Sequence, residues 1–188
     1  MKNLRFSNPL KRLFRDRSGN ALIETAIVMP ILTLNILGGM EISRYVLLNQ
    51  KLDRVAASIG DLVAQAETIS ALDIDNLFEA AKFVIKPFSL GSNGAVIVSS
   101  IGAADGNPPM VNWQRNGAGS LVAASALGAA GANATLPQGF TVPSGSNTIV
   151  AEVFYDYTPW LMSGITSPSR LYHRALFRPR LGSLTTLQ

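Results

Sequence analysis

Residues 21–40 read ALIETAIVMPILTLNILGGM, an apolar run with a single charged side chain, Glu24. A helix rises about 1.5 Å per residue, so this run is just long enough to cross a bilayer core of about 30 Å. A carboxylate inside such a helix costs on the order of 2–3 kcal/mol or more, and it marks a functional position by default. Pro30 lies in the same run. It removes one helix hydrogen bond and predicts a kink.

Positive charge is concentrated before this run. Residues 1–18 hold six basic side chains and one acidic one, whereas residues 19–188 hold ten basic and eleven acidic ones. The positive-inside rule therefore predicts that residues 1–18 stay in the cytoplasm and that the rest of the chain is sent outward. A nucleic-acid-binding protein carries its basic side chains on a folded surface, so we expect no nucleic-acid partner.

Two simpler interpretations compete for this N-terminus. A cleaved secretory signal has an apolar stretch of about 7–15 residues that ends in a small-x-small cleavage site. The run here is longer, and it continues into residues 41–45 (EISRY) without a convincing site. A plain single-pass anchor accounts for the hydropathy but leaves Glu24 without a role.

The order of basic segment, Gly19, Asn20 and then Glu24 within an apolar run resembles the class III signal of type IV pilins and pseudopilins. The resemblance implies that a prepilin peptidase cuts between Gly19 and Asn20 on the cytoplasmic side and leaves the apolar helix on the mature protein. Glu24 then becomes the fifth mature residue, and in the family this Glu is thought to meet the new N-terminus of a neighbouring subunit. A carboxylate in a low-dielectric medium needs such a positive partner.

More narrowly, residues 19–30 (GNALIETAIVMP) resemble the TadE-like minor pseudopilins of the tight-adherence (Tad) pilus. Members tend to have a Glu, an aliphatic stretch and a Pro at this spacing, then a second acidic position near the outer membrane surface, which Glu41 matches. Thr25 departs from the aromatic residue that the major pilin of that system carries after the Glu, which favours a minor component. Residues 152–159 (EVFYDYTP) and 178–180 (RPR) also resemble C-terminal parts of TadE-like proteins.

The remaining sequence predicts an α+β domain. Apolar residues at three- and four-residue steps extend the first helix to about residue 67; a coiled coil is the alternative, but the repeat lacks enough full heptads. A second helix, capped by Ser70 or Asp73, is predicted to run from near Asp73 to Lys86 and to stop at Pro87. Residues 121–130 favour a further short helix. Four strands are predicted at residues 95–101, 111–115, 148–157 and 171–177. We expect a pilin-like fold with the long helix packed on a small antiparallel sheet.

The strand at residues 148–157 shows the clearest alternation. One face is expected to carry Ile149, Ala151, Val153, Tyr155 and Tyr157, and the other Glu152 and Asp156. The aromatic group around this strand is expected to pack in the core rather than to form a binding platform; it consists of Phe154, Tyr155, Tyr157 and Trp160.

Catalytic and metal-binding motifs are missing from the sequence. The chain has no cysteine, and its one histidine, His173, lies in a predicted strand without a nucleophile elbow or phosphate loop nearby. Asp73, Asp75 and Glu79 are clustered, but acidic residues at the start of a helix complement the helix dipole and need no metal. We therefore expect no enzyme activity, no cofactor and no metal.

These observations predict three parts. Residues 1–19 form a basic cytoplasmic leader that prepilin peptidase removes, residues 20–67 a long helix that spans the membrane to about residue 40, and residues 68–188 a periplasmic α+β head. The resemblance implies a place in the bacterial inner membrane and then in the extracellular pilus. It implies four kinds of partner: prepilin peptidase, other pilin and pseudopilin subunits, the inner-membrane assembly platform and membrane lipid. The implied function is assembly or initiation of a Tad-type pilus, with the filament tip as a candidate position. The alternative is a single-pass membrane-anchored periplasmic binding domain unrelated to pili.

Overall fold

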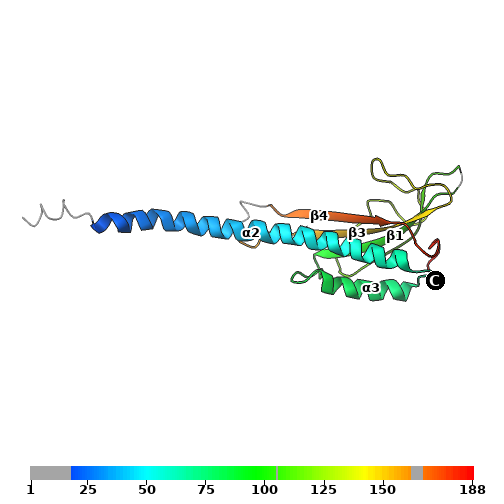
Figure 1. The fold of residues 1–188 in the computed structure, drawn as a ribbon, viewed down its shortest axis with the longest axis horizontal. Helices are drawn as coiled ribbons and strands as arrows, with labels where there is room; N and C mark the ends of the chain where they lie inside the picture. The colour runs from blue at the N-terminus through cyan, green and yellow to red at the C-terminus, as the bar shows by residue number, and fades with distance from the viewer. Residues whose placement is uncertain (1–17, 105, 162–166) are drawn as a thin grey trace, which may run out of the picture.

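The computed structural model describes residues 18–104, 106–161 and 167–188. They form, in chain order, α2 (Ser18–Gln65), α3 (Ala71–Val84), β1 (Gly94–Gly102), β2 (Met110–Gly117), β3 (Asn147–Tyr157) and β4 (Ser169–Phe177). In Figure 1 the first half of α2 projects alone, and its second half forms a head together with α3 and the sheet. The predicted α+β class is confirmed. Residues 1–17 of the predicted leader lie outside the described residues.

The helix α2 changes character along its length. Residues 19–36 are exposed on every face, although most of them are apolar. The second half buries an apolar stripe at helical spacing against the sheet; this stripe includes Leu48, Leu52, Val55, Ile59 and Val63. Gly60 permits the close approach, since a Cβ there would lie 2.8 Å from the Phe177 ring on β4, closer than ordinary contact allows. The second half of α2 therefore belongs to the core of the head, and the first half requires another apolar environment.

The helix α3 begins at a capping box, as its sequence predicts. The N–H of Asp73 donates to the Ser70 hydroxyl at 3.2 Å, and the N–H of Ser70 donates to the Asp73 carboxylate at 2.9 Å. Two of the N–H groups that have no partner within the helix are satisfied in this way. The helix ends at Val84, shortly before Pro87, which cannot continue it.

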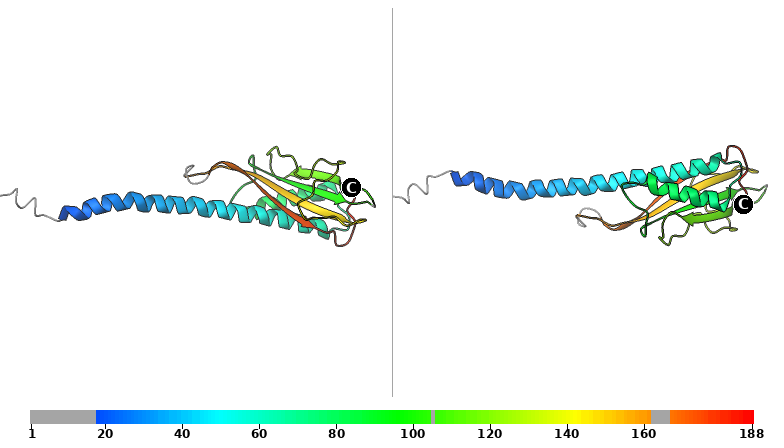
Figure 2. Two further views of the ribbon diagram at one scale, coloured as in Figure 1. Left: turned by 90° about the horizontal axis from the view of Figure 1, so that it is seen from above. Right: turned by 90° about the horizontal axis from the view of Figure 1, so that it is seen from below.

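The four strands pair antiparallel in the order β2-β1-β3-β4. β3 is central and the longest strand, and it pairs with β1 through Val98↔Ala151 and with β4 through Ala151↔Ala175. Figure 2 shows that the sheet lies along the C-terminal half of α2 only. The head is therefore carried at one end of a helix whose other end is bare.

The two faces of the sheet are covered by different parts of the chain. The predicted inward set of β3 packs with α2 and α3 in one core cluster. On the other face, Leu127 and Val142 of the connection between β2 and β3 pack with Val150. The alternation predicted for β3 is confirmed, and both of its faces are buried.

The short helix predicted at residues 121–130 is wrong. This segment has no helix and lies over the sheet as irregular chain. Gly128 and Gly131 have φ values of +108° and +81°, which a right-handed helix excludes. The N–H of Gly131 donates to the carbonyl of Val111 on β2 at 2.7 Å, so contact with the sheet overrides the local helix preference.

Candidate functional site: the exposed helix and its junction with the head

The residues that the sequence singles out at the N-terminus lie on the bare part of α2. Gly19, Asn20 and Glu24 are all exposed, and a Cβ on Gly19 would meet nothing within 4 Å. Within the described part of the chain, no hydrogen bond or ion pair reaches the Glu24 carboxylate. The helix therefore presents this carboxylate to whatever surrounds it.

The other polar side chains of the apolar run are satisfied within the helix. Thr25, Thr33 and Asn35 each donate to the carbonyl four residues earlier, at 2.8, 2.9 and 2.8 Å. Such back-bonding lets hydroxyl and amide groups enter an apolar medium. Pro30 lies inside α2, which continues on both sides of it. Among the described helices, α2 is the one long and apolar enough to cross a membrane.

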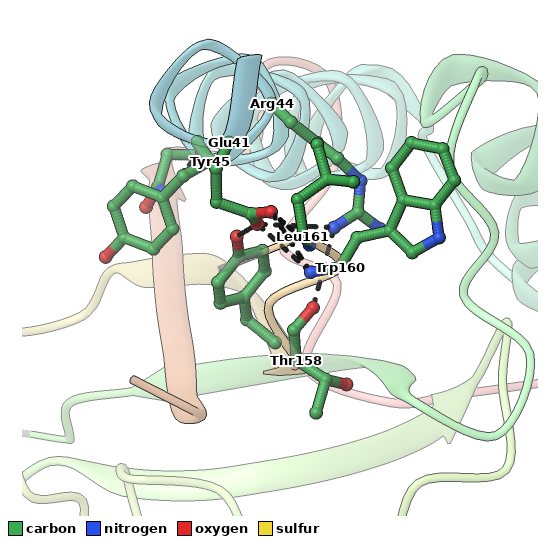
Figure 3. Close-up of polar contacts among 8 residues, drawn as sticks. Glu41, Arg44, Tyr45, Thr158, Trp160 and Leu161 are labelled. Carbon is green, nitrogen blue, oxygen red and sulfur yellow. Dashed lines mark hydrogen bonds and ion pairs between the residues drawn. The ribbon is translucent and has the colours of Figure 1, made fainter. Parts of the chain in front are cut away.

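Glu41 follows the apolar run directly and is buried, with 1% of its surface exposed. Its carboxylate accepts hydrogen bonds from the Tyr157 hydroxyl, from the N–H of Trp160 at 3.2 Å and from the N–H of Leu161 at 2.7 Å. Figure 3 shows Trp160 and Leu161 beneath α2, with the Arg44 side chain beside them. We call Glu41, Tyr157, Trp160 and Leu161 the Glu41 latch, because these residues tie α2 to the chain that follows β3.

The electrostatics of the latch favour the ionised carboxylate. The hydrogen bond from Tyr157 is the largest influence and the N–H of Leu161 the next, and together they hold the pKa of Glu41 below its ordinary value of 4.5. Burial acts in the opposite direction and is outweighed, while Arg44, 3.9 Å away, adds a smaller attraction. The Glu41 carboxylate is therefore negatively charged at neutral pH, and it is this ionised form that accepts the hydrogen bonds of the latch.

Aromatic and cationic side chains brace the latch. The rings of Tyr45 and Tyr157 pack edge to face with centroids 5.1 Å apart. The Arg44 guanidinium lies 5.8 Å from the Tyr157 ring centroid and 5.6 Å from that of Phe88, and it donates to the Thr158 carbonyl at 3.5 Å. The junction is thus built from α2, the end of β3 and the segment after α3.

The sequence interpretation of the aromatic group is correct for three residues and wrong for one. Phe154, Tyr155 and Tyr157 are buried, whereas Trp160 is 72% exposed. Trp160 lies beyond the end of β3 and no longer follows the strand alternation. Its backbone N–H, not its indole N–H, donates to Glu41. Sequence reasoning also missed the role of Glu41, since its partners are 116 to 120 residues away in the chain.

The acidic residues of α3 serve local structure. Asp73 caps the helix, Asp75 pairs with Arg115 of β2 at 2.8 Å, and Glu79 pairs with Lys82 at 2.5 Å. No three His, Asp or Glu side chains are grouped as metal ligands in the part of the chain that the structure describes. These carboxylates therefore help to place α3 against the sheet.

His173 joins β4 to α2. Its Nε2 lies 3.0 Å from the Asn49 side-chain oxygen, and its Nδ1 lies 3.5 Å from the Asp53 carboxylate. Both partners lie on the helix face that the sheet covers in part. The histidine therefore contributes to the contact between β4 and α2.

A second buried carboxylate, Glu152 of β3, fastens the connection between β2 and β3 to the sheet. It is fully buried and accepts hydrogen bonds from the Ser125 hydroxyl, from the Ala126 N–H at 3.0 Å and from the Tyr172 hydroxyl at 2.8 Å. All three donors lie on the sheet face opposite the helices. Glu152 thus holds in place the segment that was wrongly predicted to be helical.

Tyr172 is expected to lose its phenolic proton only near pH 12. Burial and then the hydrogen bond to Glu152 raise the pKa of Tyr172 to about 12 from an ordinary value of 10. A pKa raised by folding means that this contribution to stability is complete below pH 10 and is lost as the pH rises from 10 toward 12. Ultraviolet titration of tyrosinate in the wild type and in Tyr172→Phe measures it. The two curves should differ by a step near pH 12, and a difference already complete near pH 10 would contradict the expectation.

Comparison with known proteins gives a match that lies within α2. Residues 19–60 match the family model of TadE-like proteins. No curated protein and no solved structure matches the chain. The matched segment contains Glu24, Pro30 and Glu41, so the resemblance inferred from the sequence is confirmed there. Residues 19–60, which form most of α2, are thus similar to TadE-like proteins.

Proposed function

We propose that this chain is a minor pseudopilin that takes part in the assembly and initiation of a Tad-type pilus, with the filament tip as a candidate position. The observation that carries the proposal is Glu24. It stands on a bare apolar helix, five residues after Gly19, within the TadE-like segment. A carboxylate in this position is costly in lipid unless a positive group from another molecule meets it.

The charge distribution supports an orientation for this protein. Six basic residues precede the apolar run, so residues 1–18 face the cytoplasm and the head faces the periplasm of a bacterial inner membrane. Prepilin peptidase then cuts between Gly19 and Asn20. The cut creates an α-amino group at Asn20, which is the kind of cation that the Glu24 of a neighbouring subunit requires.

On this proposal, assembly transfers the first half of α2 from lipid to a filament, and this protein catalyses no reaction. The first half of α2 is stored in lipid, and it leaves the lipid when neighbouring pilin and pseudopilin helices cover the same apolar surface. Pairing of Glu24 with the amine of a neighbour removes two isolated charges from the low-dielectric medium at once. The head stays folded throughout, since its core does not involve residues 19–36.

The mature N-terminus tests the proposal. Mass spectrometry of the membrane-extracted protein is expected to find a start at Asn20 when the host's prepilin peptidase is present and an intact leader when it is deleted. Gly19→Val provides a matched control: the space beside Gly19 is open, so the substitution impairs recognition by the peptidase and leaves the helix intact. An uncut chain in the presence of the peptidase would support the anchored binding domain instead.

A further inference from the structure

The level of the Glu41 latch relative to a membrane follows from the helix itself. Residues 21–40 fill a hydrocarbon core of about 30 Å, and the polar headgroup layers bring a bilayer to about 40–45 Å. Each headgroup layer is thus about 5–7.5 Å deep, the rise of about three to five helical residues. The helical turn from Glu41 to Tyr45 therefore lies at the level of the lipid headgroups.

The backbone of two residues of the head is held at this same level by the latch. Trp160 is bound through its N–H to Glu41 and leaves 72% of its surface exposed, and Leu161 beside it is 38% exposed. Figure 3 shows the Trp160 indole beside the Arg44 side chain, under α2. These residues reach the membrane level because the latch holds them there.

A groove opens at this corner. It has a volume of about 860 Å³ and runs between α2 and the segment 87–93. Its walls include Leu47, Phe88, Leu90 and Trp160, and Arg44 is the cation among its lining residues. Ile42 and Val46 extend the exposed apolar surface of α2 past residue 40 on the helix itself. Leu47, which is 39% exposed, belongs both to α2 and to the groove, so apolar surface of the helix reaches the head there.

We propose that Trp160, Leu161 and Arg44 form a seat that binds phospholipid headgroups of the outer leaflet and holds the head against the membrane. The inference rests on the membrane span of the proposed function and adds a lipid-binding surface to it. The indole ring is amphipathic and favours the interface between headgroups and acyl chains, where tryptophan is enriched. The positive charge of the Arg44 guanidinium complements the negative charge of a lipid phosphate.

The chemistry of the corner favours lipid over a second copy of the chain. Among the described residues, three donors of the latch bind the Glu41 carboxylate, and one guanidinium nitrogen of Arg44 lies 3.9 Å from it and donates to the Thr158 carbonyl. A guanidinium has five N–H donors, so its other N–H groups remain for an anion at the headgroup level. Phosphate is the anion that every phospholipid places at this depth.

Fluorescence quenching in vesicles tests the seat. The full-length protein is reconstituted in phosphatidylcholine vesicles that contain lipids brominated either near the headgroup or deep in the acyl chains. The chain has two tryptophans, so subtraction of the Trp160→Phe signal isolates Trp160. We expect shallow bromines to quench Trp160 at least about twofold more strongly than deep ones, as a side chain held at the interface requires.

A matched control moves the reporter to the far end of the head. Leu181 is 73% exposed, as Trp160 is, and it follows Arg180, whose N–H donates to the carbonyl of Ala64. That carbonyl lies about 35 Å further along α2 than Glu41. In Trp160→Phe/Leu181→Trp, after subtraction of the Trp160→Phe signal that Trp113 gives, we expect no quenching of the introduced tryptophan by either lipid and full quenching by aqueous acrylamide.

Each other outcome overturns the seat in a distinguishable way. If the protein floats with the vesicles but acrylamide alone quenches Trp160, the head stands clear of the membrane and the span remains. If Trp160 is shielded from both quenchers and this shielding disappears on dilution with lipid, the occupant is a second copy of the chain. If the protein does not float with the vesicles, the membrane span itself is wrong and the proposed function fails with it.

Discussion

Glu24→Ala is expected to leave the protein in the membrane but to remove it from assembled pili. The carboxylate costs about 2–3 kcal/mol in an apolar medium, and pairing with a neighbouring amine recovers an amount of this order. Loss of that term weakens the contact between subunits by roughly 30- to 160-fold. The measurement is the amount of the protein in sheared pilus fractions relative to that in membranes.

Neighbouring substitutions make this experiment specific. Thr25→Ala changes the adjacent residue, whose hydroxyl is already satisfied by its own helix, and is expected to assemble normally. Glu24→Gln keeps the shape without the charge and is expected to fail as Glu24→Ala does, whereas Glu24→Asp keeps the charge and is expected to retain part of the function. Normal assembly of Glu24→Ala would contradict the proposed pairing and favour a simple anchor.

Glu41→Ala is expected to detach the end of β3 from α2 while the core of the head stays folded. The substitution removes the acceptor of the backbone N–H groups of Trp160 and Leu161, and partly buried polar groups that lose their partner are costly. Tyr157→Phe removes only the hydroxyl and is expected to cost about 1–3 kcal/mol. Hydrogen exchange should rise around residues 157–161, and the melting temperature in detergent should fall.

A surface carboxylate provides the control for Glu41. Glu79 forms an ion pair with Lys82 on the exposed side of α3, so Glu79→Gln is expected to shift the melting temperature little. Equal effects of Glu41→Gln and Glu79→Gln would show that the latch contributes no more than a surface pair.

The latch also predicts a pH dependence. Folding lowers the pKa of Glu41, so its contribution to stability is complete above the ordinary value of 4.5 and is lost as the pH falls below that value through the folded pKa. The difference in melting temperature between the wild type and Glu41→Gln should be constant at neutral pH and shrink on acidification below about pH 4.5. A difference that stays constant throughout acidification would contradict an ionised latch.

The latch and the lipid seat together connect the two parts of the molecule. Glu41 fixes the direction in which the head leaves the membrane helix, and the same contacts place Trp160 beside the headgroups. A subunit that leaves the membrane for a filament would carry the latch with it and would exchange the lipid seat for contacts with other subunits.

The features that depend on local periodicity can be predicted from the sequence. An apolar run followed by amphipathic spacing specifies one long helix, the Ser70–Asp73 pair specifies the start of α3, and alternation specifies the two faces of β3. The resemblance to TadE-like proteins is also local, because it depends on the spacing of Glu24 and Pro30 along one helix.

Tertiary structure alone decided what depends on contacts between distant residues. The partners of Glu41 lie more than a hundred residues away, and no spacing rule links a helical carboxylate to the N–H groups of a turn after a strand. The same applies to the strand order and to residues 121–130, where sheet contacts and Glu152 outweigh local helix preference. The exposure of Trp160 differs from the sequence prediction for this reason: strand alternation ends with β3, and the latch holds the backbone that follows.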